Sequence, residues 1–445
     1  MISKCRKYFA GSGLGPTLLR AAFGSMGLRI AGMGFAFLVG VQLARGLGAQ
    51  GYGIYGVAMS ITALLAVPTE FGLPQLVTRE VAAANTRSEW GRLKGIVQWA
   101  SRTSFLVFAV VAVGVLVWLY LSNIAIDSEL ALTVLAGLTM IPLVALGKIK
   151  GATLRGLHHI VKGQLPDILV RPLAFSAFLL VATGLVTRMT PSMAMILGSA
   201  GSGVALLVAS FMLRKSLPRQ VATASVASSS PDWWSAAFPM ALSEGMRVLQ
   251  SHVVILLLAA IAAMSAVGAY RVATSVALIV SVPVTMLSVV CAPVISSLFA
   301  GGDNARLQRL LRAIAAGMSL GALLVALPFF VAGDWLIGWV FGAEYLAAVP
   351  ALQIICLGIV VSGACGAGAA LLNMTGNHKH VTKASGISLA LLCVTAPVLI
   401  SYCGILGAAV ASASAQIVWS IIMWLDARRV IGLDSSVLSL MFVKS

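Results

Sequence analysis

Residues 243–252 read Ser-Glu-Gly-Met-Arg-Val-Leu-Gln-Ser-His and run directly into the uncharged segment 253–263. Glu244, Arg247 and Ser251 are three and four residues apart, so an α-helix places them on one face, with His252 at its edge. Charged side chains in a segment apolar enough for a membrane are costly, and they usually mark a functional site. The stretch therefore predicts a membrane helix with a functional polar face.

This stretch has a counterpart in the first half of the chain. Ser25-Met-Gly-Leu-Arg29-Ile repeats Ser243-Glu-Gly-Met-Arg247-Val at a spacing of 218 residues. Residues 53–68 match residues 268–283 at a spacing of 215, and a Gly-x-His at 156–158 recurs at 376–378. Three matches in the same order indicate an internal repeat. We therefore expect two homologous lobes, residues 1–222 and 223–445, joined by the serine-containing linker 214–233.

The composition indicates an integral membrane protein. The 445 residues are 60% hydrophobic and 10% charged, and solidly apolar runs of about 20 residues favour membrane-spanning helices over a β-barrel. The predicted fold is all-α, with twelve transmembrane helices in two homologous six-helix bundles. Because six is even, a pseudo-two-fold axis along the membrane normal should relate the bundles. The twelve runs lie near residues 25–45, 53–72, 103–122, 129–147, 167–186, 191–213, 236–262, 272–300, 311–332, 346–373, 384–402 and 405–425.

The net charge of +17 follows from the expected topology. Of the 30 Lys and Arg residues, 24 fall in the two termini and in every second loop. This is the positive-inside pattern of an even number of spans, with both termini in the cytoplasm. The charge therefore does not indicate a nucleic-acid partner. The basic stretches 87–94 and 306–312 are either plain cytoplasmic loops or surfaces that contact anionic membrane lipids.

Motifs of common enzymes are absent from the sequence. It contains no G-x-x-x-x-G-K-[ST], H-E-x-x-H, C-x-x-C or G-x-S-x-G pattern, so the usual ATPase, metalloprotease, redox and hydrolase sites are not expected. The six cysteines have no paired spacing that would indicate disulfides or a metal site. We predict a transporter that is not an enzyme and that needs no cofactor.

Several short motifs resemble those of bacterial O-antigen and capsule-unit (Wzx-type) flippases. Residues 43–55, Leu-Ala-Arg-Gly-Leu-Gly-Ala-Gln-Gly-Tyr-Gly-Ile-Tyr, are similar to the turn after that family's first helix. Residues 70–73 with 79–80 resemble its next acidic segment, and Leu-Asn-Met-Thr-Gly at 372–376 resembles its L-N-x-x-G. The resemblance covers the whole chain at the level of layout. It implies the multidrug/oligosaccharidyl-lipid/polysaccharide (MOP) exporter superfamily, a central cavity and alternating access.

The resemblance also implies a substrate and a location. The substrate would be a polyprenyl-pyrophosphate-linked oligosaccharide, turned across the bacterial inner membrane, with polysaccharide assembly proteins as possible partners. Two other functions remain open: an efflux transporter for small amphiphiles, and a non-transporting scaffold of a polysaccharide assembly complex. Drug exporters of the superfamily typically carry acidic residues in the cavity, whereas the repeated charge here is Arg, which suits an anionic substrate.

The candidate site residues follow from the repeat. Arg29 and Arg247 occupy equivalent positions, and two planar guanidinium groups could hold a pyrophosphate. The alternative is that both reach towards cytoplasmic headgroups. Glu244 either balances Arg247 or carries a coupling proton, and His252 is either a packed neutral side chain or a proton relay. Glu70, near the inner end of the second helix, is a further candidate for coupling or charge balance.

Two weaker features complete the expectations. His158 and His378 lie in basic loops, where they either contact a lipid headgroup or are solvated beside a glycine turn. Asp167 and Arg171 are four residues apart, which favours a local ion pair.

Overall fold

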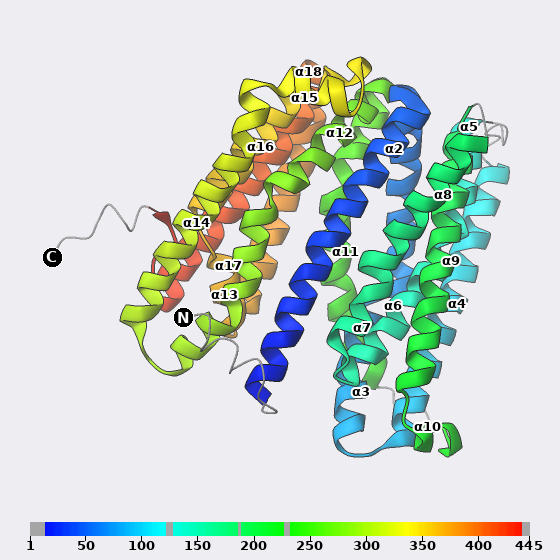
Figure 1. The fold of residues 1–445 in the computed structure, drawn as a ribbon, viewed down its shortest axis with the longest axis vertical. Helices are drawn as coiled ribbons and strands as arrows, with labels where there is room; N and C mark the ends of the chain where they lie inside the picture. Colours follow the sequence, from blue (N-terminus) through cyan, green and yellow to red (C-terminus); the bar gives the residue numbers. More distant parts are fainter. Residues whose placement is uncertain (1–13, 122–127, 186–187, 227–231, 438–445) are drawn as a thin grey trace. The chain divides into compact units, whose positions relative to one another are not determined.

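The computed structural model describes residues 14–121, 128–185, 188–226 and 232–437, and every regular element in these ranges is helical (Figure 1). The predicted all-α class is therefore confirmed. In chain order the elements are α2 (Leu14–Glu70), α3 (Leu73–Thr86), α4 (Trp90–Leu121), α5 (Glu129–Leu138), α6 (Met140–Gly156), α7 (Ile160–Leu165), the π-helical turn η1 (Pro166–Val170), α8 (Arg171–Leu185), α9 (Pro191–Ser216), α10 (Arg219–Thr223), α11 (Asp232–Ile261), α12 (Met264–Val280), α13 (Val282–Ala300), α14 (Asn304–Val331), α15 (Gly333–Val340), the 3-10 turn η2 (Ala343–Tyr345), α16 (Ala348–Ala364), α17 (Gly368–Met374) and α18 (His378–Ile431).

Many of these helices are long and apolar enough to cross a membrane. Within the described ranges there are nine such helical runs, and α16 with α17, bent by 48°, makes a tenth. Two of the nine contain breaks, at Gly48 (φ 67°) in α2 and at Gly404 (φ 55°) in α18. A continuous helix of 57 residues would be roughly 85 Å long, far more than one span needs. The breaks support two spans in each of α2 and α18, while the total of twelve spans remains a prediction.

The chain divides into two compact units. Unit 1 comprises residues 1–46 and 58–248, and unit 2 comprises residues 47–57 and 249–445. The units and the predicted lobes have different boundaries. Residues 47–57 of the predicted first lobe belong to unit 2, and residues 223–248 of the predicted second lobe belong to unit 1. The lobes were defined by the sequence repeat, so their boundary at residue 222 remains a prediction.

In unit 1, α6 packs against α3, α4 and α9, and α8 lies beside α9 (Figure 1). The turn between α2 and α3 packs on α11 through Gly72, whose φ of 66° is one that glycine adopts without strain. A Cβ at Gly72 would lie 2.7 Å from the Cβ of Met240, so the backbone of the turn touches α11 directly. The main buried cluster of this unit contains Leu73, Leu76, Val77, Val81, Leu93, Ile96, Ile149, Leu154 and Trp233.

In unit 2, α14, α16 and α18 pack together, with α12 against α16 and α17 against α18. The segment after α18 is tied to this bundle by a reciprocal pair of hydrogen bonds. Asp434 N donates to Gln308 Oε1 at 2.9 Å, and Gln308 Nε2 donates to Asp434 O at 2.6 Å. The main buried cluster contains Ile295, Leu307, Leu311, Ile314, Met318, Leu371, Leu372, Ala384 and Met423.

Candidate functional site

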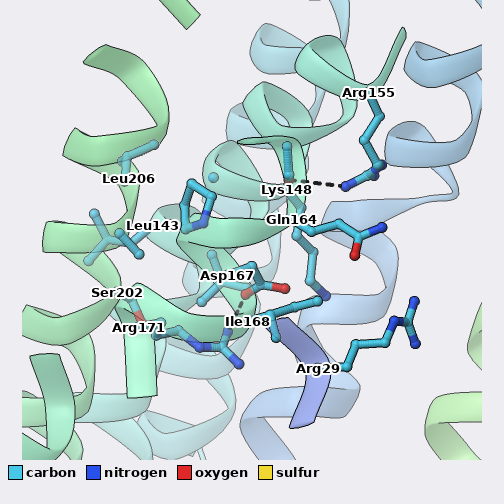
Figure 2. A pocket seen from close by; sticks show the side chains of 15 residues that line it. Arg29, Leu143, Lys148, Arg155, Gln164, Asp167, Ile168, Arg171, Ser202 and Leu206 are labelled. Atoms are coloured by element: carbon cyan, nitrogen blue, oxygen red, sulfur yellow. Dashed lines mark hydrogen bonds and ion pairs between the residues drawn. The ribbon is translucent and has the colours of Figure 1, made fainter. Parts of the chain in front are cut away.

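A basic cavity of about 260 Å³ opens in unit 1 (Figure 2). Its walls come from α2, α6, α7, η1, α8 and α9. Five of the lining residues are ionisable, and four of them are basic: Arg29, Lys148, Arg155 and Arg171, against the single carboxylate of Asp167. The remaining wall is a mixture of apolar side chains with Gln164 and Ser202. A cavity with this charge favours an anion.

Close packing of glycine positions Lys148 and Arg155. Gly151 of α6 and Gly163 of α7 face each other so tightly that a Cβ on either residue would lie 2.5 Å from the carbonyl oxygen of the other. Lys148 is about one turn before Gly151, and Arg155 is about one turn after it, so both lie beside α7. Arg155 Nη1 also donates to Gly163 O at 3.4 Å. The helix contact therefore fixes two of the four cations.

The π-helical turn η1 positions the other two cations of the cavity, Arg171 and Arg29. It begins at Pro166, which has no N–H to donate, and it widens the helix between α7 and α8. Arg171 Nη1 pairs with Asp167 Oδ1 at 3.0 Å, which confirms the predicted local ion pair. A Cβ at Gly32 of α2 would lie 2.5 Å from the carbonyl oxygen of Ile168, so α2 touches this turn. Arg29, about one turn earlier in α2, is thereby held at the cavity.

Arg29 differs from Arg171 in its contacts. It is exposed, and within the residues that the structure describes it makes no hydrogen bond or ion pair. Arg171 is already neutralised in part by Asp167. Arg29 is therefore available to bind a ligand. A phosphate group could accept hydrogen bonds from its guanidinium, which is bonded to no carboxylate of the described residues.

A second charge cluster adjoins the cavity through Lys148. Lys148 Nζ donates to both carboxylate oxygens of Glu70, at 2.6 and 2.8 Å. On α11, Arg247 Nε donates to Glu244 Oε2 at 3.0 Å, and the same residues share a further short ion pair. Electrostatic interactions also connect Glu244 with Lys148, and Arg247 with Glu70. These four residues, which we call the charge quartet, have no net charge.

The contact of α11 with the α2–α3 turn builds the quartet. Gly72 lies against Met240 and Ala241, and a Cβ at Gly245 would lie 3.3 Å from Val67. These contacts place the middle of α11 beside the end of α2. Glu70 is largely buried, with 11% of its side chain exposed, whereas 65% of the Arg247 side chain is exposed. Arg247 is therefore accessible, although Glu244 engages it.

The structure thus separates the two predicted arginines into different local settings. Arg29 lines the basic cavity with Lys148, whereas Arg247 belongs to the quartet and is not among the residues that line the cavity. Lys148 is common to both groups. A shared anion contact of Arg29 and Arg247 remains a prediction. His252, half-buried in α11, has an interaction partner of its own.

The two predicted loop histidines lie in turns. His158 is exposed, with a positive φ of 64°, two residues after the end of α6. Its neighbour His159 has a pKa below the usual value, because burial, Lys162 and His158 all disfavour its charged form. His378 begins α18, and its Nδ1 lies 3.1 Å from Asn373 Oδ1. Their contact with lipid headgroups remains a prediction.

The sequence analysis did not predict three of the cavity residues as ligands of an anion, namely Lys148, Arg155 and Arg171. Lys148 and Arg155 looked like residues of a cytoplasmic loop, but α6 continues through both of them to Gly156. The paired glycines at 151 and 163 were the available signal, because close helix contacts need small residues.

Solved structures with a similar arrangement of helices include transporters of the MOP superfamily. An inward-facing multidrug resistance MATE family transporter of the MOP superfamily matches 95% of this chain and 100% of its own, with a TM-score of 0.68 and 12% identity. The lipid II flippase MurJ in its inward closed conformation matches 92% of this chain and 87% of its own, with a TM-score of 0.66 and 14% identity. A MOP superfamily transporter from Pyrococcus furiosus matches 94% of this chain and 96% of its own, with a TM-score of 0.62 and 14% identity. Its structure is described as having a binding pocket of reversed polarity.

At these identities the likeness shows the fold, which is that of MOP superfamily transporters. Residues 18–299, more than half of the chain, match the family of polysaccharide biosynthesis proteins, and the chain belongs to this family. None of the curated protein sequences compared with it matches. The protein is therefore a member of the polysaccharide biosynthesis family with the fold of multi-pass membrane transporters.

Proposed function

We propose that the protein is a flippase that moves polyprenyl-pyrophosphate-linked oligosaccharides across the bacterial inner membrane by alternating access. The observation that carries the proposal is the cavity with four cations and one carboxylate, in a chain of the polysaccharide biosynthesis family. A pyrophosphate is the strongly charged part of such a lipid, and it needs cations wherever it leaves water. The basic cavity supplies them.

Three of the four basic residues would have different parts in binding. Arg29 is free of a carboxylate partner among the described residues and offers a planar fork to phosphate oxygens. Arg155 is held by the Gly163 carbonyl and adds fixed positive charge. To bind the ligand, the ammonium group of Lys148 would either leave the Glu70 carboxylate or contact both groups at once. Anion binding at Lys148 would therefore weaken its hold on Glu70.

This exchange suggests a route for coupling to a proton. Anion binding at Lys148 would release the Glu70 carboxylate and would also change the interaction of Lys148 with Glu244. Glu70 or Glu244 would carry the proton, with His252 as a possible relay. The basic loops and both termini would face the cytoplasm, where membrane lipids are partners and polysaccharide assembly proteins are possible ones.

The test combines identification of bound lipid with transport. Mass spectrometry of lipids that remain on the purified protein should find a polyprenyl-pyrophosphate glycan. Proteoliposomes should translocate a labelled lipid of that class, and Arg29→Ala should reduce the rate at an equal protein level. Retention of ordinary phospholipids alone, with no translocation, would refute the proposal.

An efflux transporter for small amphiphiles is the second candidate. It is favoured by a separate cavity of about 500 Å³ between α2, α4 and α5, lined by Ser128 and otherwise by apolar residues such as Trp118 and Leu119. Transport of hydrophobic cations with no effect of the Arg29 substitution would support this function over the first.

A further inference from the structure

The second cavity of unit 1, of about 500 Å³, lies between the later part of α2, the C-terminal part of α4 and the start of α5. It shares no lining residue with the basic cavity. Its floor is made by the buried side chains of Leu119, Ala131 and Val134. Half-buried apolar residues of α2 and α4 form the walls: Ile61, Leu65, Val111 and Val115. We call this space the apolar cavity.

The lining of the apolar cavity offers a ligand almost no hydrogen bonds. None of its described lining residues is charged, and Ser128 and Trp118 alone among them carry polar side-chain atoms. The Oγ of Ser128 already accepts a hydrogen bond from Ala131 N at 3.2 Å, as the N-cap of α5, and Trp118 has an interaction partner of its own. A sugar, a phosphate or an organic cation would lose its hydration here without compensation. The ligand that fits this lining is a hydrocarbon.

The mouth of the apolar cavity opens towards lipid. It lies at Gly114 and Trp118 of α4, which are both exposed. A membrane-spanning helix that is apolar all round turns such a face to the bilayer. Around the mouth, α4 exposes the large apolar side chains of Val110, Val113, Leu116 and Val117. A hydrocarbon chain can therefore enter directly from the bilayer.

Gly114 keeps this mouth open. A Cβ at position 114 would meet nothing within 4 Å, so no close helix contact requires a glycine there. Glycine in the interior of a helix also weakens the helix. An unfilled entrance to the cavity is what the missing side chain provides.

We propose that the apolar cavity binds the polyprenyl chain of the lipid-linked substrate. The identity of this lipid rests on the proposed function. An unbranched acyl chain is thin and fits shallow grooves between lipid-facing helices. A polyprenyl chain carries a methyl branch on every isoprene unit and needs a wider space, which a cavity of about 500 Å³ supplies.

The position of the cavity along α4 gives the chain site a direction. The helix begins at Trp90, within the basic stretch 87–94, and the cavity lines its far end, from Val111 to Leu119. The positive-inside pattern predicts that this end is not cytoplasmic. A chain bound there lies in the outer half of the membrane, where the chain of the lipid belongs once its head has crossed. The site would thus hold the lipid in the orientation of the product.

The experiment locates lipid chains on the full-length protein in vesicles of phosphatidylethanolamine and phosphatidylglycerol. Two photoreactive probes are compared at the same mole fraction: a polyprenol with a diazirine in its chain, and a phosphatidylethanolamine with a diazirine in one acyl chain. Peptide mass spectrometry identifies the labelled residues after irradiation. Because the polyprenol has no pyrophosphate, it tests the chain site without the basic cavity.

Two substitutions fill the cavity from different helices, and one is a matched control. Gly114→Phe fills the mouth from α4, and Ala131→Leu fills the floor from α5. The control is Gly184→Phe in α8, because Gly184 is also exposed, a Cβ there would meet nothing within 4 Å, and it does not line the cavity. We expect the polyprenol to label the cavity residues of α4 and α5 in the parent protein. Both filled variants should lower this labelling about tenfold, because the chain loses its buried apolar contact, and Gly184→Phe should leave it unchanged.

Three results would overturn the inference. Equal labelling of the cavity by the two probes would mean that ordinary bilayer lipid occupies it. Unchanged labelling by the polyprenol in both filled variants would mean that its chain binds elsewhere. Displacement of the polyprenol probe by tetraphenylphosphonium, but not by unlabelled polyprenol, would assign the cavity to small amphiphiles.

The same assay separates this inference from the proposed function. Arg29→Ala removes a cation of the basic cavity and should not change labelling by the polyprenol. Selective labelling in a protein that translocates no pyrophosphate-linked lipid would contradict the proposed function and leave the chain site in place. Translocation without selective labelling would contradict the chain site alone.

Discussion

Lys148 offers the sharpest test of how the basic cavity works, because it belongs both to the cavity and to the charge quartet. Lys148→Met removes one of four cations from the cavity and leaves Glu70 without its ammonium partner. One charge-assisted contact contributes on the order of 1.5–3 kcal/mol, so pyrophosphate should bind roughly ten- to a hundredfold more weakly. Removing one partner of a buried pair costs about 3–5 kcal/mol of stability. Since 31% of Lys148 is exposed, we expect about 2 kcal/mol here.

The two effects can be separated by a double variant. Glu70→Gln removes the carboxylate that Lys148 must release, so it should leave pyrophosphate binding unchanged or make it tighter. In Lys148→Met, Glu70→Gln, no unpaired charge remains, and most of the lost thermal stability should return. The lost binding should not return, because the cation is still missing.

The assay uses purified protein, with inorganic pyrophosphate and a polyprenyl pyrophosphate as ligands. Calorimetry gives the affinity, and thermal unfolding without ligand gives the stability. Leu206→Ala, a change of an apolar residue of the same cavity wall, controls for general effects on the cavity. If the double variant binds pyrophosphate as tightly as the parent protein, Lys148 is only a structural partner of Glu70.

Three further predictions concern function, topology and stability. Arg29→Ala and Arg247→Ala should each greatly reduce glycan export at normal protein levels, and Lys at either position should be milder; normal export by the double Ala variant would end the shared anion site. A cysteine that replaces Lys150, with the native thiols removed, should not react with an impermeant reagent outside intact cells, and labelling there would contradict the topology. Burial opposes ionisation of Asp434, but hydrogen bonds from Ser436 and Trp424 outweigh it and lower its pKa. Asp434→Asn should therefore lower the thermal unfolding temperature above the ordinary aspartate pKa of about 3.9, and this difference should shrink as the pH falls through the lowered pKa.

The sequence was sufficient for the class of fold because membrane helices are specified locally. Long apolar runs must satisfy their own backbone hydrogen bonds in lipid, which leaves helices as the solution. The ends of these helices were harder to predict. At Lys148 and Arg155 the basic charge marks a cytoplasmic helix end and a loop equally well, and only the structure shows that α6 continues through both.

The cavity depends on contacts between residues distant in the sequence, which no local pattern specifies. Arg29 comes close to Arg171 because Gly32 packs on the π-helical turn, and the turn itself results from how Pro166 joins α7 to α8. The sequence identified Arg29 through its repeat. Arg155 has no such counterpart, so the repeat could not indicate it.

The repeated segments 49–56 and 264–271 contact each other about a local pseudo-two-fold axis, because a Cβ at Gly53 would clash with Met264 O and a Cβ at Gly268 would clash with Ala49 O. This contact explains why Arg271 has no charged counterpart in the other repeat. A residue on a two-fold axis faces its own equivalent, so two large side chains there would occupy the same space. Arg271 faces Gly56, and this inequality lets one guanidinium lie between Tyr52 and Tyr55. Positions away from such an axis carry no such restriction, and Arg can stand at both positions of a repeat pair. A repeat pair that combines Gly with a large polar residue therefore predicts a place where the two copies of the repeat are in contact.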